Sequence, residues 1–192
     1  RERNGAKGRT HEIERLVARS LRGAVDLEQL GPLSMTVDCE ILNADGGTRC
    51  ASITAGSIAL RLAIRRLIAS GRCLPAKLRP TEQQRKEGWK PPILSEDEAH
   101  GHEMAVMPCD VAALSVGIVD GEVKVDLDYV LDSNADVDMN VVMTSAGAFV
   151  EVQGTGEEAT YTREELDSLI DNAVSGIKML HEHQVKVLEG VN

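Results

Sequence analysis

Aromatic side chains are scarce in this sequence, with one Trp, two Tyr and one Phe among 192 residues. A chain of this length can bury a substantial core, and it is long enough for one large domain or two small ones. Hydrophobic residues still make up 42% of the chain. We therefore expect a core built from Val, Ile, Leu, Ala and Met.

Long apolar runs are absent as well. No run approaches the roughly 20 residues that a helix needs to cross a bilayer, and the N-terminus, RERNGAKGRT, has the features of neither a signal peptide nor a methionine start. The sequence therefore predicts no membrane association.

The cysteines and histidines lack the spacing of a metal site. The four cysteines include no CxxC pair, which argues against zinc or a disulfide framework and favours free thiols in a reducing cytoplasm. They are Cys39, Cys50, Cys73 and Cys109. We interpret the pairs His100/His102 and His181/His183 as surface side chains.

Positive charge is nearly absent from the second half of the chain. Positions 91 to 192 carry 21 Asp or Glu and four Arg or Lys, whereas positions 61 to 90 carry nine Arg or Lys and two Glu. The net charge of -10 argues against a general affinity for nucleic acid, but a basic half can bind a polyanion locally. The alternative is that these arginines are solvated on helix faces.

Hydrophobic spacing predicts three main helices. Thr10 is a fair N-cap for the first, whose apolar stripe runs to Val25, and the second extends from about 49 to 69 and ends near Gly71. Residues 162 to 165 form a capping box that opens the third, from about 163 to 188.

Strand signals come from alternation and turns. Alternating apolar and polar residues predict a half-buried strand over 34 to 42, and the turn sequences at 120 to 121 and 145 to 147 predict two hairpins. Positions 74 to 108 hold five of the six prolines and are predicted to form a long loop. The order helix, strand, helix, four strands, helix indicates an α+β fold.

The stretch NADGGTRCASITAG, positions 43 to 56, indicates an anion site. Gly46 and Gly47 allow successive N–H groups to point the same way at the positive N-terminus of the second helix. Arg49 adds a fork of donors suited to phosphate, and Arg9 lies in the same way beside the start of the first helix. A flexible turn capped by Thr48 explains the stretch equally well.

A second group of candidates lies in DSNADVDMN, which contains Asp132 and Asp138. On a single strand these residues would be about 20 Å apart, so they converge only if residues 133 to 135 make a turn, which their types favour. Converging carboxylates beside a phosphate site would hold Mg²⁺. The alternative is a charged connection between hairpins. Asp126 and Asp128 alternate with apolar residues and are interpreted as a solvated strand face.

Five colinear stretches resemble the ribonuclease PH family, phosphate-dependent exoribonucleases that trim transfer-RNA 3′ ends. They are KGRTHEIERL, DCEILNADGGTRCASIT, SVGIVDGEVKVDLDY, DVDMNVVMT and FVEVQGTGE. The resemblance covers nearly the whole chain as a single domain over 1–192, in which 74–108 is interpreted as an inserted loop.

The resemblance implies phosphorolysis, in which inorganic phosphate as co-substrate attacks the terminal linkage and a nucleoside diphosphate is released. It assigns phosphate binding to Arg9, Gly47, Thr48 and Arg49, and Mg²⁺ binding with acid catalysis to Asp132 and Asp138. It also implies a mixed sheet with packed helices, a homo-oligomeric ring that is typically hexameric, and tRNA precursors and other RNA 3′ ends as partners.

The family has strands and basic residues that would precede Arg1, so we expect this chain to be N-terminally incomplete and inactive alone. RNA is expected to approach over the basic half, at Arg1, Arg3, Lys7 and the arginines from 61 to 72. Three alternatives remain: a non-catalytic RNA-binding ring subunit, a truncated inactive product, and a metal-dependent hydrolase that uses the same aspartates.

Overall fold

Two hairpins form the sheet of this protein, whose computed structural model describes residues 8–156 and 159–191. Strands β1 (Val111–Val119) and β2 (Glu122–Val125) are joined at Asp120 and Gly121, which have φ values of 52° and 76°. Positive φ at both turn positions matches the right-handed twist of the strands. Strands β3 (Val137–Thr144) and β4 (Phe149–Gly156) form the second hairpin. Both hairpins were predicted correctly.

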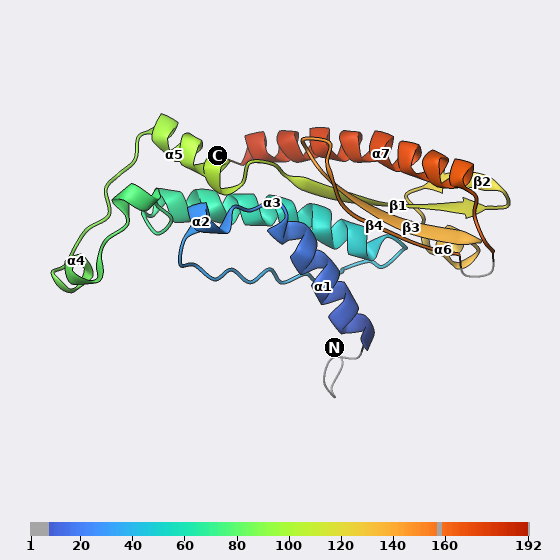
Figure 1. Ribbon diagram of the computed structural model, residues 1–192, viewed down its shortest axis with the longest axis horizontal. Coiled ribbons are helices and arrows are strands. Elements are labelled where there is room, and N and C mark those ends of the chain that lie inside the picture. Colours follow the sequence, from blue (N-terminus) through green and yellow to red (C-terminus); the bar gives the residue numbers. More distant parts are fainter. Residues whose placement is uncertain (1–7, 157–158, 192) are drawn as a thin grey trace.

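The two hairpins join through β1 and β3 to give the strand order β2-β1-β3-β4, and the pairs within the described chain are all antiparallel. Helix α3 (Thr48–Ala69) covers one face of the sheet and α7 (Arg163–Gly190) covers the other (Figure 1). Because both faces are covered, β1 is buried along its whole length. The α+β class is confirmed, and so are α3 and the capping box that opens α7.

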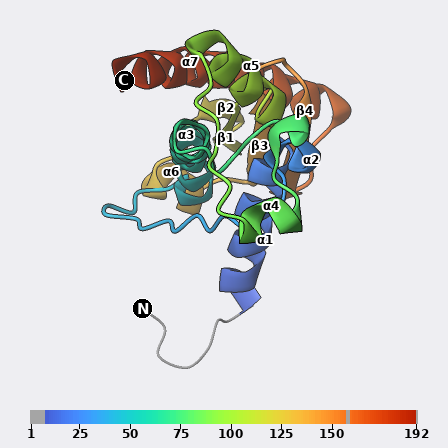
Figure 2. The same ribbon diagram turned by 90° about the vertical axis from the view of Figure 1, so that its left-hand side faces the viewer.

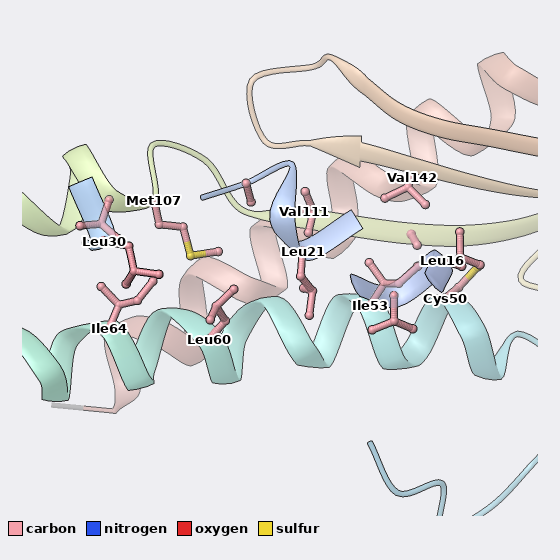
Figure 3. Packing of buried hydrophobic residues seen from close by; sticks show 14 of the residues in the cluster. Leu16, Leu21, Leu30, Cys50, Ile53, Leu60, Ile64, Met107, Val111 and Val142 are labelled. Atoms are coloured by element: carbon pink, nitrogen blue, oxygen red, sulfur yellow. The ribbon is translucent and has the colours of Figure 1, made fainter. Parts of the chain in front are cut away.

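The strand pleat divides the core in two. Val111, Ala113 and Val142 pack with α3, whereas alternate residues of β1 and β3 pack on α7. On the α3 side the buried side chains continue along the helix toward α2 (Leu27–Leu30) and α5 (Glu96–Val106), as Figure 3 shows. Helix α1 (Gly8–Arg22) packs across α3 on the side away from α7 (Figure 2). It begins at Gly8, so Thr10 lies inside the first turn and is not the N-cap.

Helix α3 is also hydrogen-bonded to the backbone of β1. Strand β2 pairs only with residues 116–119 of β1, so no strand of the described residues pairs with residues 111–115 on that edge of β1. Ser57 Oγ and Thr54 Oγ1 accept hydrogen bonds from the N–H groups of Val111 and Ala113 at 3.1 and 3.0 Å, and Gln184 of α7 donates to the carbonyl of Val111 at 2.9 Å. These bonds hold the N-terminal half of α3 against the sheet, where the candidate site lies.

The strand predicted over 34–42 is wrong. Met35 and Val37 are half-buried against the core and their neighbours are exposed, so the predicted alternation is present over residues 34–38. Cys39 and Ile41, which the pattern also places inward, are exposed. No strand of the described residues pairs with this segment, however. A strand requires the backbone of a neighbouring strand, which an alternating pattern alone does not supply.

The long loop predicted over 74–108 is also wrong, because the segment contains a 3₁₀ turn (Ala76–Leu78), α4 (Glu82–Lys86) and α5. Capping boxes at Thr81 and Ser95 start the two α-helices, and prolines lie between them. Because α5 packs on the core, His102 is buried and not at the surface as predicted. The interpretation of this segment as an insertion stays a prediction. Within the described ranges, no helix is long and apolar enough to span a bilayer.

Candidate functional site

A cavity of about 850 Å³ lies at the N-terminal end of α3. It is bordered by the first turn of α1, the glycine turn before α3, the short helix α6 (Tyr129–Ser133), and strands β3 and β4. All six residues predicted for the site line this one cavity. They are Arg9, Gly47, Thr48, Arg49, Asp132 and Asp138.

The glycine turn presents backbone donors to the cavity. Gly46 and Gly47 have φ values of 72° and 50°, in the left-handed region that glycine adopts without strain. A Cβ atom on Gly46 would lie 2.0 Å from the carbonyl oxygen of Leu127, so this position also has no room for a side chain. Gly47 is the N-cap of α3 and no side chain caps that helix end. Within residues 8–156 and 159–191 the first turn of α3 therefore has no side-chain cap, and the alternative of a turn capped by Thr48 is wrong.

The turn is attached to α6 by Asp45, whose Oδ1 accepts a hydrogen bond from the N–H of Tyr129 at 3.1 Å. This bond connects the glycine turn at one side of the cavity with the segment that carries Asp132. Asp45 was not predicted to have a role.

Arg9 and Arg49 reach the cavity from two different helices. Arg49, near the start of α3, places its Nη2 3.3 Å from Oε2 of Glu12 on α1. Glu12 follows Arg9 by one helical turn and lines the same cavity. Glu12 was not predicted as a site residue, although the i,i+3 spacing from Arg9 places both residues on one face of α1.

The pleat of the sheet directs a second set of side chains into the cavity. Asp138 pairs with Gly117 and Thr155, and Asn140 pairs with Ser115 and Gln153. All of these except Gly117 line the cavity. A Cβ atom on Gly117 would lie 2.6 Å from the carbonyl oxygen of Val137, so glycine permits the close packing beside Asp138.

Asn140 connects the sheet to α3. Its Oδ1 accepts a hydrogen bond from Sγ of Cys50 at 3.0 Å. Burial raises the pKa of the Cys50 thiol to about 12, although the positive charge of Arg49 acts in the opposite direction. The thiol therefore stays protonated and can keep donating this bond.

Asp132 lies in α6, and the chain turns directly after this helix to enter β3, which carries Asp138. Both residues therefore line the same cavity. Helix α6 ends with Asn134 as its C-cap, and Asp136 then donates its N–H to the carbonyl of Ile118 at 2.9 Å, in line with β3. The predicted turn at 133 to 135 is confirmed. Asp128 was wrongly interpreted as part of a strand face, because it is the N-cap of α6 and accepts from the N–H of Leu131 at 2.8 Å. Asp126 likewise follows the end of β2, with a φ of 57°.

The two aspartates differ in exposure: Asp132 is exposed and Asp138 is half-buried. Among the residues that the structure describes, no group of three or more His, Cys, Asp and Glu could hold a metal ion. Mg²⁺ is commonly bound through one or two carboxylates and completed by water and substrate phosphates. A pair of carboxylates in an open cavity fits that kind of site.

The arginines predicted to contact RNA separate into two kinds. Arg61 is buried and bound to Glu103 and Asp110, so it was wrongly counted among the RNA contacts. Arg66 and Arg72 are exposed. Arg1, Arg3 and Lys7 lie outside the described residues.

Comparison with known proteins identifies matches along most of the chain. Residues 1–65 match domain 1 of the 3′ exoribonuclease family and residues 110–176 match its domain 2. The chain is 48% identical over 174 residues to ribonuclease PH of Corynebacterium glutamicum, covering 91% of this chain and 59% of that protein. It is also 48% identical over 185 residues to ribonuclease PH of Rhodopirellula baltica, covering 96% of this chain and 65% of the relative.

Solved structures show the same fold at low sequence identity. Rrp46 of rice (Oryza sativa) superposes with a TM-score of 0.60 at 13% identity, covering 97% of this chain and 68% of that one. A structure of the Archaeoglobus fulgidus exosome with RNA bound to its active site gives a TM-score of 0.57 at 18% identity, covering 95% and 64%.

Proposed function

The chain belongs to the 3′ exoribonuclease family, and on this basis we propose that it acts as a phosphate-dependent 3′→5′ exoribonuclease. It spans 59–61% of the length of two ribonuclease PH relatives, so the proposed activity is that of the whole protein to which these residues belong. The product released at each step would be a nucleoside diphosphate.

One observation carries the proposal: a single cavity is lined by two arginines, by a helix start that no side chain of the described residues caps, and by the carboxylates Asp132 and Asp138. Arg9, Arg49 and the N-terminus of α3 suit an anion. A hydrolase would need no second anion besides the RNA, so the same aspartates used for hydrolysis would leave these arginines without a purpose. The presence of both sets also argues against a non-catalytic subunit.

In the proposed reaction, an oxygen of inorganic phosphate forms a bond to the phosphorus of the last phosphodiester. The bond from that phosphorus to the O3′ of the preceding nucleotide breaks, and O3′ takes up a proton. Arg9, Arg49 and the α3 donors would hold the attacking phosphate against an RNA backbone of the same charge. Asp138, half-buried beside the α3 face of the sheet, would supply the proton.

Asp132 would hold Mg²⁺ in this site while Asp138 is protonated, and Asp138 would join it as a second ligand once it has given up its proton. When bound, the cation would neutralise charge that develops on the phosphoryl oxygens. Positioning of the RNA end in the cavity by the chain's own residues would contribute most of the remaining catalysis.

The finer assignments follow the relatives and belong to the same proposal. We infer that the RNA substrates include tRNA precursors, because the relatives are named ribonuclease PH. The resemblance to ribonuclease PH implies a ring of identical subunits, typically six, and the description of a structural neighbour as an exosome agrees with a ring-like oligomer. All four cysteines are free, which supports a reducing compartment such as the cytoplasm.

The test uses the full-length protein and an RNA with a single-stranded 3′ end, incubated with Mg²⁺ in phosphate buffer and in phosphate-free buffer. Phosphorolysis predicts shortening only with phosphate and release of nucleoside diphosphates. Equal shortening without phosphate, with nucleoside monophosphates as products, would replace this proposal by hydrolysis.

A further inference from the structure

A basic segment projects from the C-terminal end of α3. Residues 75–92, here called the α4 arm, carry the 3₁₀ turn and α4 at the end of the molecule away from the strands (Figure 1). Residues 77–90 contain five Lys or Arg and two Glu, in a chain whose net charge is -10. The arm lies between the two stretches matched to the family, 1–65 and 110–176. It is therefore a basic surface to which the family match assigns no role.

The base of the arm is fixed to the rest of the protein. Arg79 donates from Nη2 to the carbonyl of Glu28 on α2 and from Nε to the carbonyl of Leu74, both at 2.9 Å. Gly71 has a φ of 69°, and a Cβ atom there would lie 2.3 Å from Cβ of Pro91, so the two ends of the arm are in contact. A surface held in this way is preformed, which lowers the entropic cost of binding a ligand.

A cleft of about 320 Å³ on the arm combines cationic residues with an aromatic one. It is lined by Trp89, the single tryptophan of the chain, and by Lys77, Arg79 and Lys90. Trp89 is partly exposed, and its backbone N–H donates to the carbonyl of Gln84 at 3.0 Å. No acidic residue of the described chain lines this cleft. Its chemistry therefore suits an anion that also carries a flat ring.

Lys77 and Lys90 are the cations of the cleft that a ligand can reach. Both are exposed, and neither forms an ion pair within the described ranges, whereas Arg79 holds backbone carbonyls. The pKa of Glu98 is lowered by its capping hydrogen bonds and, in addition, by the charge of Lys77, but Glu98 does not line the cleft. Two exposed ammonium groups are thus available to bind an anion.

We propose that the α4 arm binds an unpaired stretch of the RNA substrate, upstream of the 3′ end that enters the cavity. Trp89 stacks on one base, and Lys77 and Lys90 contact phosphates beside it. Proteins hold single-stranded nucleic acid with this combination of aromatic and basic side chains, without reading its sequence. An acidic protein surface would match the charge but offers no base to stack. The inference rests on the proposed exoribonuclease function and adds a second contact with the same substrate.

The arm and the cavity lie at opposite ends of α3. This helix has 22 residues and is therefore about 33 Å long. Helices α1 and α4 lie on the same side of α3, away from α7 (Figures 1 and 2), and the first turn of α1 borders the cavity. An RNA strand reaches both places only if it is long enough to follow α3. The arm should therefore favour long substrates over short ones.

The experiment measures binding of the full-length protein to two single-stranded RNAs with the same 3′ end. One is a short oligonucleotide that fills only the cavity, and the other is long enough to span α3. We expect Trp89→Leu to weaken binding of the long RNA about 5- to 150-fold, as for the loss of one stacked base. Replacing Lys77 and Lys90 together with Gln should reduce the magnitude of the slope of log K against log salt by about 1.4. Binding of the short RNA, and its shortening in phosphate, should be unchanged.

Two controls match these variants. Trp89→Phe keeps an aromatic face and should retain most of the affinity for the long RNA. Replacing Lys178 and Lys186 together with Gln removes two exposed lysines from α7 and should leave the slope as in the wild type. Circular dichroism verifies that each variant is folded.

The outcomes separate this inference from the function on which it rests. Unchanged binding of the long RNA in both arm variants would overturn the role of the arm and leave phosphorolysis standing. Equal weakening of the short and the long RNA would indicate a structural effect, and loss of oligomers with RNA binding intact would indicate a contact between subunits; either result also overturns the proposal. Wild-type protein that fails to shorten either RNA in phosphate would refute the proposed function, while the binding comparison would still decide the role of the arm.

Discussion

The Nε atom of Arg61 lies 2.7 Å from Oδ1 of Asp110, inside the molecule. The same guanidinium donates to Glu103 Oε1 at 3.0 Å and to the carbonyl of Met107 at 2.9 Å. Burial lowers the pKa of Arg61, but the hydrogen bonds and charges of Asp110 and Glu103 outweigh burial and raise it. One side chain thus joins α3 to α5 and to the start of β1.

Arg61→Met is expected to destabilise the protein by about 3–5 kcal/mol, because it leaves buried carboxylates without their partner. Arg65 still contacts Glu103, which favours the lower end of that range. The measurement is the free energy of unfolding in urea. Arg66→Met, on an exposed position of the same helix, should change it by no more than about 0.5 kcal/mol. Equal effects of the two substitutions would contradict a structural role for Arg61.

Arg61 shows which part of this protein can be predicted from sequence. A basic cluster predicts a charged surface, but whether one of its members is buried depends on carboxylates that lie 42 and 49 residues further along the chain. The same limit explains the strand predicted over 34–42, whose alternation is correct only as far as residue 38 and whose pairing would not be local. The hairpins and the capped start of α7 were predicted correctly, because turn residues and capping boxes act within a few positions.

The cavity was predicted in two parts. The part formed by the glycine turn and Arg49 could be predicted, because glycines next to an arginine at a helix start are neighbours in the sequence. The placement of Asp132 and Asp138 on one cavity required a turn that the residue types only favoured. Glu12 was missed because its significance appears only when α1 crosses α3 and brings it to Arg49.

Exposed arginines are expected to bind RNA through its phosphates. Each contact with single-stranded RNA contributes about −0.7 to the slope of log K against log salt. Replacing Arg66 and Arg72 together with Gln should therefore reduce the magnitude of that slope by about 1.4. The slope is measured from RNA-binding titrations at several salt concentrations.

Lys178→Gln is the control. It removes one positive charge from α7, which covers the face of the sheet opposite α3. It should leave the slope unchanged. A double variant with the wild-type slope would mean that Arg66 and Arg72 do not contact RNA.

The bond from Cys50 to Asn140 predicts a pH dependence of stability. The pKa of Cys50 is raised from 9.0 to about 12 by burial, so above pH 9 the unfolded chain loses this proton while the folded chain keeps it. A rise in pH therefore destabilises the folded protein. The free energy of unfolding should fall by about 1.4 kcal/mol per pH unit between the unfolded and folded pKa values of Cys50.

Cys50→Ser removes the titration and retains a donor for Asn140. Unfolding in urea, measured for both proteins from pH 8 to pH 10.5, should show the wild type losing stability relative to Cys50→Ser above pH 9. Parallel curves for the two proteins would contradict a buried, protonated thiol at this position.

Arg49→Ala is expected to raise the phosphate concentration needed for half-maximal RNA shortening by about 10- to 100-fold. The substitution removes charge-assisted hydrogen bonds worth roughly 1.5–3 kcal/mol each. Initial rates are measured in the full-length protein over a series of phosphate concentrations. Lys178→Ala, at an exposed position of α7, serves as the control, and an unchanged phosphate requirement in Arg49→Ala would contradict the phosphate site.

Asp138→Asn is expected to reduce turnover by about 10²–10⁴-fold, because it keeps the shape of the side chain but removes both the acidic proton and the negative charge. Asp138 lies within β3, paired with Gly117 and Thr155, so an isosteric side chain should preserve the sheet. Turnover is measured at saturating phosphate and over a range of Mg²⁺ concentrations, with circular dichroism to verify folding. Asp120→Asn is the matched control, since Asp120 is exposed at the β1–β2 turn with a φ of 52° that Asn adopts readily. If Asp138→Asn retained wild-type turnover and the same Mg²⁺ dependence, Asp138 would be only a polar residue lining the cavity, and the acid would have to be another group.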